Sequence, residues 1–309
     1  MYIKIHLNLS NDKIFNILIL MKKGESLMKI FISADMEGIS GVATNQQLKT
    51  PSEYQRFRKL MTADVNAAIE GAFNGGATEV VVADGHGNMS NIIIEELDSR
   101  ARLVSGSNRV MCQLEGLNET FSGIMFVGHH GREAGSDVTV ISHTLAGICV
   151  KEMKINGKVV GETEMNTMVA GSFGVPAIFI SGDDAYVKEV KETLPNVEGA
   201  VTKRAVDRFS AELLHPEVAQ TIIREKAEKA VERIGEFTPT KVNGPITFEI
   251  DFKGPQQAKM TTTLPTVELI SPTKIRFTCD DMVTAYKHMW GCVIIAMTAT
   301  NGVLGSVNS

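Results

Sequence analysis

The chain has 309 residues, 43% of them hydrophobic and 22% charged, with a formal net charge of -5, as expected for a globular protein of one or two domains. The absence of clustered Lys and Arg argues against a nucleic-acid partner, and the apolar runs fall well short of the roughly 20 residues of a membrane span. Four scattered cysteines without a CxxC pair argue against a structural cysteine–zinc site or a disulfide framework, and favour a reducing cytoplasm.

Residues 1–27 mix Asn, Lys and Ile without the ordered regions of a signal peptide. A strand pattern then opens abruptly at Met28, and Lys23-Gly24-Glu25 can be encoded by purine-rich codons that resemble a ribosome-binding site. We therefore expect residues 1–27 to be a non-native or disordered extension, with translation starting at Met28. The alternative is a genuine, poorly packed N-terminal segment.

From residue 28 onward, short apolar runs alternate with helical patterns. The runs at 29–34, 79–83, 101–105, 123–127 and 177–181 suit buried parallel strands. Apolar spacing predicts a long helix over 52–73, which ends at Gly75-Gly76, and a short helix over 92–97. A hairpin is expected over 148–160, because Asn156-Gly157 favours a tight turn. We predict an α/β fold with a doubly wound, mostly parallel sheet over residues 28–195.

The pattern changes after residue 195. A charged amphipathic helix is predicted over 216–234, followed by a strand over 246–252 and a helix over 255–262. Two strands over 266–270 and 274–279 and a last helix over 280–298 complete the chain. We expect residues 196–309 to form a smaller α+β domain.

Side chains that bind metals gather in the loops after the predicted strands. They are Asp35, Glu37, His86, His129, His130, His143 and Glu162. In open α/β sheets, ligands bind beyond the carboxyl ends of the strands, and imidazole together with carboxylate suits zinc or a similar first-row ion. Asp35 and Glu37 point the same way in an extended segment, so both can reach one metal centre.

Each of these residues also has a purely structural interpretation. Asp35 could cap a turn, His86 could be a hydrogen-bonded loop residue, and Glu162 could be a solvated hairpin residue. Because neighbours on a strand face opposite sides, at most one of His129 and His130 is expected in the site.

The segment 33–38 reads SADMEG and fits the SxDxEG signature of the DppA-type zinc-dependent D-aminopeptidases. The chain resembles this family from Met28 nearly to its C-terminus, with DxHxN at 84–88, GHH at 128–130, SH at 142–143 and GE at 161–162 in order. This ordered set is far more specific than SxDxEG alone. The resemblance implies the same two-part fold and a ring-like homodecamer whose active sites face an internal channel.

The resemblance also implies a site with two zinc ions. Asp35 matches the aspartate that bridges both ions in the family pattern. Glu37 and His86 match the other ligands of the first ion, and His130 and Glu162 match those of the second.

His143 matches the family's proposed catalytic histidine. His129 stands where the family also accepts an aromatic residue, so it is not expected to bind metal. The segment between His130 and His143 is slightly longer than in the family pattern, which leaves the geometry of this loop open.

The activity implied is hydrolysis of the N-terminal amide of short peptides that contain D-residues, such as D-Ala-D-Ala. His143 would protonate the departing amine or stabilise the tetrahedral oxyanion. Asp84 would either orient the His86 imidazole or cap a turn.

Two other functions are considered. A dinuclear metallophosphoesterase is opposed by motif loops that contain no Lys or Arg except Arg132. A non-catalytic dipeptide-binding component of a transport system is opposed by the complete ligand set.

Overall fold

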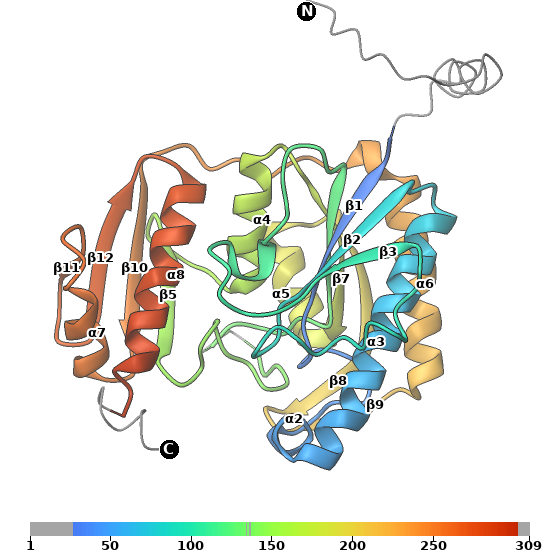
Figure 1. Ribbon diagram of the computed structural model, residues 1–309, viewed down its shortest axis with the longest axis horizontal. Coiled ribbons are helices and arrows are strands. Elements are labelled where there is room, and N and C mark those ends of the chain that lie inside the picture. The colour runs from blue at the N-terminus through green and yellow to red at the C-terminus, as the bar shows by residue number, and fades with distance from the viewer. Residues whose placement is uncertain (1–26, 134, 136, 302–309) are drawn as a thin grey trace, which may run out of the picture.

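The computed structural model describes residues 27–133, 135 and 137–301 (Figure 1). The expected extension and its start site therefore lie, apart from Leu27, outside the described residues. The described chain forms two β-sheets with helices packed on them (Figure 1).

The larger sheet, sheet A, has seven strands in the order β3-β2-β1-β4-β7-β8-β9. All neighbours are parallel except β8 and β9. The strands are β1 Lys29–Ala34, β2 Glu79–Asp84, β3 Ala101–Val104, β4 Gly123–Val127, β7 Ala177–Asp183, β8 Glu198–Asp207 and β9 Ser210–Leu213. The chain first builds outward from β1 to β3 and then returns to build outward from β4. The predicted doubly wound sheet is confirmed, and its order reverses between β1 and β4.

The smaller sheet, sheet B, has the order β11-β12-β10-β5-β6 and is antiparallel throughout. Its strands are β5 Val150–Ile155, β6 Lys158–Val159, β10 Ile246–Phe252, β11 Glu268–Leu269 and β12 Lys274–Cys279. Burial alternates along β10, where Phe248 and Ile250 are buried and Thr247 and Glu249 are partly exposed, as in a sheet with one covered face. The covering helices are α7 Pro255–Thr261 and α8 Met282–Thr298.

The two sheets do not divide at residue 195, where the sequence analysis placed the domain boundary. Strands β8 and β9 extend sheet A, and helix α6 (Pro216–Glu232) packs on that sheet. Conversely, the hairpin β5–β6 from the first half belongs to sheet B, because β5 pairs with β10. The local turn pattern correctly predicted the hairpin, and Asn156 and Gly157 both have positive φ, but it carried no information about a partner strand so distant in sequence.

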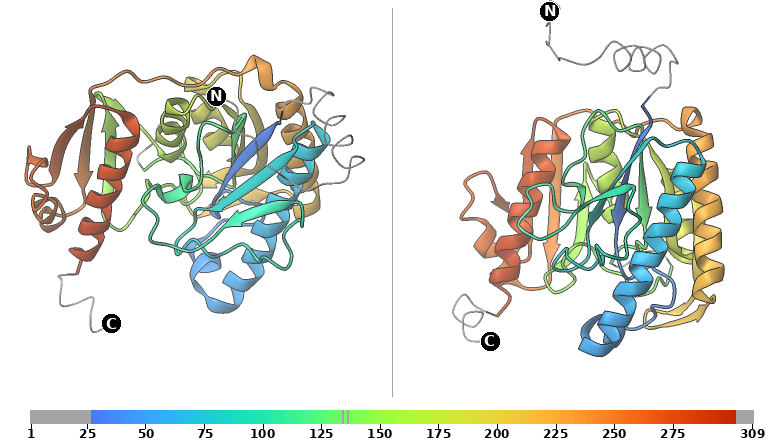
Figure 2. Two further views of the ribbon diagram at one scale, coloured as in Figure 1. Left: turned by 45° about the horizontal axis from the view of Figure 1, so that its top comes forward. Right: turned by 45° about the vertical axis from the view of Figure 1, so that its right-hand side comes forward.

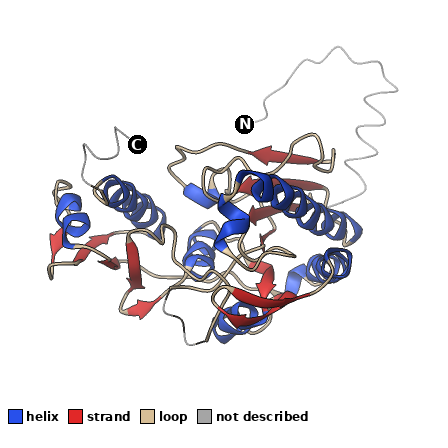
Figure 3. Cartoon of the chain, turned by 90° about the horizontal axis from the view of Figure 1, so that it is seen from below, coloured by secondary structure: helices blue, strands red, loops and turns tan. Residues whose placement is uncertain are grey.

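Helices cover both faces of sheet A (Figure 3). On one face, α3 (Pro51–Asn74) and α6 lie side by side (Figure 2, right). They approach so closely at Gly71 that a side-chain carbon there would overlap the Arg224 carbonyl oxygen. The opposite face carries α4 (Glu162–Ser172) and α5 (Asp184–Thr193). The remaining elements are short: α2 (Asn45–Lys49) and the 3₁₀ turns Cys112–Leu114 and Ile234–Glu236.

The core on the α4 face continues from sheet A into sheet B. It joins Phe126 and Ile180 of sheet A to Met165 of α4, and then to Tyr286 of α8 and Ile250 of sheet B. Because α4 is packed between the two sheets, its first residue has a fixed position relative to the strand ends of sheet A.

One predicted helix is absent. Residues 92–97 form bends and turns. Side chains from outside the segment bind its first backbone donors: the Asp84 carboxylate accepts from Ile92 N at 2.8 Å, and Thr62 Oγ1 from Ile93 N at 3.0 Å. The other predicted strands and helices are present, with ends that differ by a few residues. Among the described residues, no helix has the length and apolar character needed to cross a membrane.

Candidate metal centre

The predicted metal-binding residues meet at the carboxyl edge of sheet A, where the strand order reverses. Asp35 and Glu37 follow β1, His86 follows β2 and His130 follows β4. The loops after β1 and β4 are in contact, since Gly38 N donates to Gly128 O at 2.7 Å. A side-chain carbon at Gly38 would overlap the His129 carbonyl oxygen, so this approach requires glycine.

The first group of ligand atoms comes from Asp35, Glu37 and His86. His86 Nδ1 lies 3.2 Å from Asp35 Oδ1 and 2.9 Å from Glu37 Oε2. Both carboxylates are buried, with exposed fractions of 3% and 5%. The structure therefore brings together the three residues expected at the first ion, and they form a set able to hold a metal ion.

The second group shares Asp35 with the first. His130 Nε2 lies 3.4 Å from Asp35 Oδ2 and 3.5 Å from Glu162 Oε1. The two oxygens of Asp35 thus face two different imidazoles. His130 Nε2 is buried and makes no hydrogen bond within the described part of the chain. A buried nitrogen lone pair of this kind, beside two carboxylates, fits a first-row metal ion.

The charges in the centre favour a cation. Burial alone would raise the pKa of Asp35, but its contacts with the His130 and His86 imidazoles outweigh burial and hold this pKa well below its usual value. Burial alone would lower the pKa of His130, whereas the charges of Glu162 and Asp35 raise it to about 10. The carboxylates therefore stabilise positive charge at the imidazoles. The same negative field favours a divalent ion bound to the imidazole nitrogens in place of protons.

His129 has different surroundings from His130. It is fully buried, its Nε2 lies 3.3 Å from Ser33 Oγ, and its ring meets Phe126 edge-on. Burial lowers its pKa. One His129 nitrogen does come within 4.8 Å of carboxylate oxygens of Asp35 and Glu162, so proximity alone does not separate the two histidines. The shorter contacts of His130 favour it as the ligand.

Glu162 is a helix residue and not a solvated hairpin residue. It opens α4, is 3% exposed, and accepts hydrogen bonds from Gln113 Nε2 at 2.6 Å and Leu145 N at 2.7 Å. Gln113 is in turn held by Asn166 Nδ2 at 2.6 Å. Gln113 follows no predicted strand, and none of the shared motifs contains it.

His143 lies against both groups. Its ring stacks on that of His130, with centroids 4.0 Å apart and an interplanar angle of 12°. Its Nε2 is 4.0 Å from Glu37 Oε1, and its Nδ1 donates a hydrogen bond to Ile141 O at 2.8 Å. His143 also forms a set with His130 and Glu162 that could hold a metal, so the geometry is compatible with either a catalytic or a ligand role.

Asp84 caps a turn and does not orient the His86 imidazole. Its carboxylate accepts from the Asn91 and Ile92 backbone amides and from Asn91 Nδ2. Asn91 Nδ2 also donates to the His86 carbonyl oxygen at 2.6 Å. Asp84 thus fixes the His86 loop through its backbone, while the imidazole contacts the two carboxylates.

A buried lysine fixes the loop that carries Asp35 and Glu37. The Lys203 ammonium, on β8, donates to the carbonyl oxygens of Glu37, Ile39 and Val42 at 2.6, 2.9 and 2.7 Å. Burial lowers the pKa of Lys203 to about 8. All three hydrogens of the ammonium group are donated to carbonyl oxygens, so the Lys203 side chain holds the backbone of this loop. No motif marked this lysine in the sequence.

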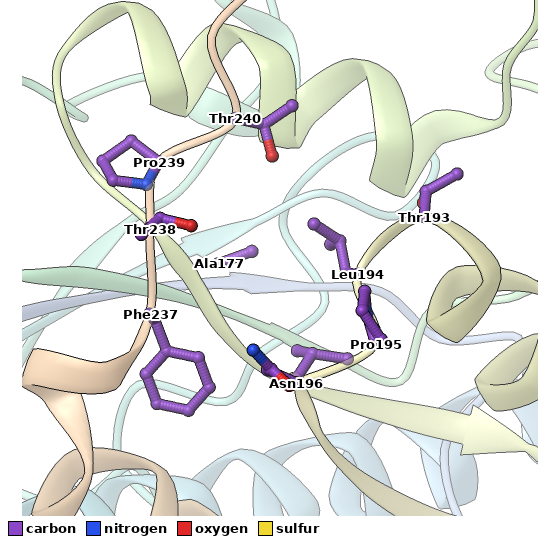
Figure 4. Close-up of a pocket in the computed structure, with 10 residues that line it drawn as sticks. Ala177, Thr193, Leu194, Pro195, Asn196, Phe237, Thr238, Pro239 and Thr240 are labelled. Atoms are coloured by element: carbon purple, nitrogen blue, oxygen red, sulfur yellow. The ribbon is translucent and has the colours of Figure 1, made fainter.

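A cavity of about 130 Å³ lies at the centre, and its lining includes His143 and four of the proposed metal ligands, namely Asp35, Glu37, His86 and Glu162. A second pocket, of about 220 Å³, lies at the opposite edge of the sheet near the start of β7 (Figure 4). Its lining residues, among them Asn196, Phe237 and Thr238, carry no ionisable side chain, so it offers neither a metal ligand nor an acid–base group.

Comparison with known proteins agrees with this geometry. Residues 28–291 match the sequence pattern of a family described as D-aminopeptidase. A D-aminopeptidase of Bacillus subtilis (strain 168) is 36% identical over 273 residues, which cover 87% of this chain and 98% of that enzyme. A solved structure, described as the Zn-dependent D-aminopeptidase DppA from Bacillus subtilis, a self-compartmentalizing protease, matches with a TM-score of 0.84 and 34% identity, over 87% of this chain and 98% of that one. The chain therefore belongs to the D-aminopeptidase family, whose members are metal-dependent hydrolases.

Proposed function

We propose that this D-aminopeptidase holds two zinc ions and removes the N-terminal residue from short D-peptides such as D-Ala-D-Ala. The observation that carries the two-ion proposal is the Asp35 carboxylate, which turns one oxygen toward His86 and the other toward His130. A single carboxylate placed between two imidazoles is the arrangement a bridging ligand needs.

In this proposal Glu37 and His86 are the other ligands of the first ion, and His130 and Glu162 are those of the second. Asp35 is a ligand of both. Zinc bound there would supply a water made acidic near neutral pH and would polarise the scissile carbonyl. The protein's part is to fix these ligands. Gln113 and Leu145 hold Glu162, and the His130 Nδ1–H is used by the Gly131 carbonyl oxygen at 3.0 Å, which directs Nε2 toward the carboxylates.

His143 is proposed as the proton-transfer residue. Because its Nδ1 carries the hydrogen donated to Ile141 O, Nε2 is the nitrogen free to exchange a proton. That nitrogen lies on the Glu37 side of the cavity. In its protonated form, Nε2 can donate to the departing amine or to the oxyanion.

We expect the purified enzyme to cleave D-Ala-D-Ala much faster than L-Ala-L-Ala, and to lose this activity when a chelator removes its metal. Quantifying released alanine for both substrates, with and without chelator, tests this expectation. Equal rates for the two stereoisomers would contradict the D-peptide assignment and leave the hydrolase intact. Binding without cleavage would favour a dipeptide-binding component, and cleavage of a phosphate ester in place of peptides would favour the phosphoesterase.

We also propose that the chain assembles as a homodecamer in the cytoplasm. The relative of solved structure is described as self-compartmentalizing, and apolar side chains such as Val206, Leu213 and Val218 are exposed around β9 and the start of α6. All four cysteines are free thiols, including Cys279, which is only partly buried. Free thiols suit a reducing compartment such as the cytoplasm. Light scattering should give about ten times the chain mass of 33.6 kDa, and a monomeric mass would contradict the assembly. Recovery of the native protein outside the cytoplasmic fraction would contradict the location.

A further inference from the structure

Another pocket, of about 430 Å³, adjoins the metal centre and shares Glu37 and His143 with it. We propose that Arg208 and Lys49, which line this pocket, bind the C-terminal carboxylate of the substrate. This inference rests on the proposed aminopeptidase function and names the group that the pocket recognises.

The pocket lining has a positive charge balance. Arg208 and Lys49 supply two cations, and the one acidic lining residue is Glu37, which the proposed function assigns to a metal ion. Lys49 ends the short helix α2 and has no ion pair within the described part of the chain. The motif loops contain no cation except Arg132, but Arg208 reaches the site from the β8–β9 turn. The expected lack of a cation for a phosphate substrate is therefore wrong.

Arg208 is held in place beside His143. Its Nη2 donates to the carbonyl oxygen of Ser142 at 2.5 Å and to Glu133 Oε2 at 3.1 Å. Its own carbonyl oxygen accepts from Ile141 N at 2.8 Å. The turn between β8 and β9 is therefore bonded to the segment that carries His143. A guanidinium fixed in this way loses little side-chain entropy when it binds an anion.

The guanidinium retains donors for a ligand. Nη1 of Arg208 makes no hydrogen bond among the described residues, and 39% of the side chain is exposed. The pairing with Glu133 is shared, because Lys253 Nζ lies 3.6 Å from the other oxygen of that carboxylate. Arg208 is thus not fully neutralised, and its Nη1 hydrogens remain for a charge-assisted hydrogen bond to a carboxylate.

The apolar part of the lining suits the side chain of the last substrate residue. Ile141, Ile148 and Phe209 supply apolar surface in the same pocket, which suits an alkyl side chain such as that of alanine. A peptide with a C-terminal amide would have no negative charge for Arg208 and Lys49 to bind.

Steady-state kinetics on D-Ala-D-Ala and on its C-terminal amide test the subsite. The zinc-loaded wild type should prefer the free acid, with a ratio of kcat/KM values of about tenfold or more, as expected for a charge-assisted hydrogen bond. Arg208→Gln should lower this ratio to near one, chiefly through a higher KM for the acid. Lys49→Met, a change on an exposed residue, should lower it in the same direction by a smaller factor.

The matched control is Arg204→Gln, because Arg204 lies on the adjoining strand β8, pairs with Glu212 and does not line the pocket. It should leave the acid-to-amide ratio unchanged. Zinc content of each variant, measured by elemental analysis, should equal that of the wild type. If wild type cleaves acid and amide equally well, or if both pocket variants leave the ratio unchanged, the carboxylate subsite is wrong although the aminopeptidase stands. If the wild type cleaves neither peptide, it is the proposed function that fails.

Discussion

Asp35→Asn is expected to remove more metal than any other single substitution in the centre. If the two-ion proposal holds, the wild type should carry about two divalent ions per chain. Loss of a ligand specific to one ion, as in Glu37→Gln, should release mainly that ion. Asp35 faces both His86 and His130 through its two oxygens, so an amide at this position weakens both sites and should reduce activity to that of the chelated protein. Elemental analysis of the purified variants measures the loss.

A matched control is Asp137→Asn, because Asp137 is an exposed aspartate that pairs with Lys188 and lies in none of the metal-binding sets. It should keep both ions, and circular dichroism should show that each variant is folded. Retention of both ions by Asp35→Asn, or active wild-type protein without bound transition metal, would overturn the bridging assignment.

The part of the centre that the sequence could predict follows from the geometry of parallel strands. Their carboxyl ends meet at one edge of a sheet, so residues that directly follow β1, β2 and β4 had to approach one another. Asp35, His86 and His130 meet this condition, and the structure brings them together. The hairpin turn at Asn156-Gly157 was predictable for a similar reason, because the turn type is a local property.

Other parts depend on contacts that leave no local pattern. Helix α4 was missed because nearly all of its residues are buried between the two sheets, so it lacks the apolar stripe of a surface helix. Lys203 and Arg208 reach the site from strand β8 and the β8–β9 turn, more than 160 and about 65 residues away from the segments they contact. A single sequence does not show which distant residue will meet a given loop.

His143 presents the remaining choice between two roles. Its ring stacks on His130, and it could join His130 and Glu162 around an ion. The five proposed ligands, with Asp35 shared, already give each ion three protein groups, which is the usual number in a catalytic zinc site that keeps a position for water or substrate. A sixth protein ligand would occupy a position that the reaction needs.

We therefore expect His143→Ala to keep both ions and a nearly unchanged KM, while kcat falls by about 10²–10⁴, the usual effect of losing a general acid or base. The fall should be equal in kcat and kcat/KM, because the lost interaction exists only in the transition state. His215→Ala, at an exposed position before α6, is the control and should change neither parameter. A His143→Ala protein that has lost one ion and regains activity in excess zinc would identify His143 as a ligand, since added metal can refill a weakened site but cannot replace a missing proton donor.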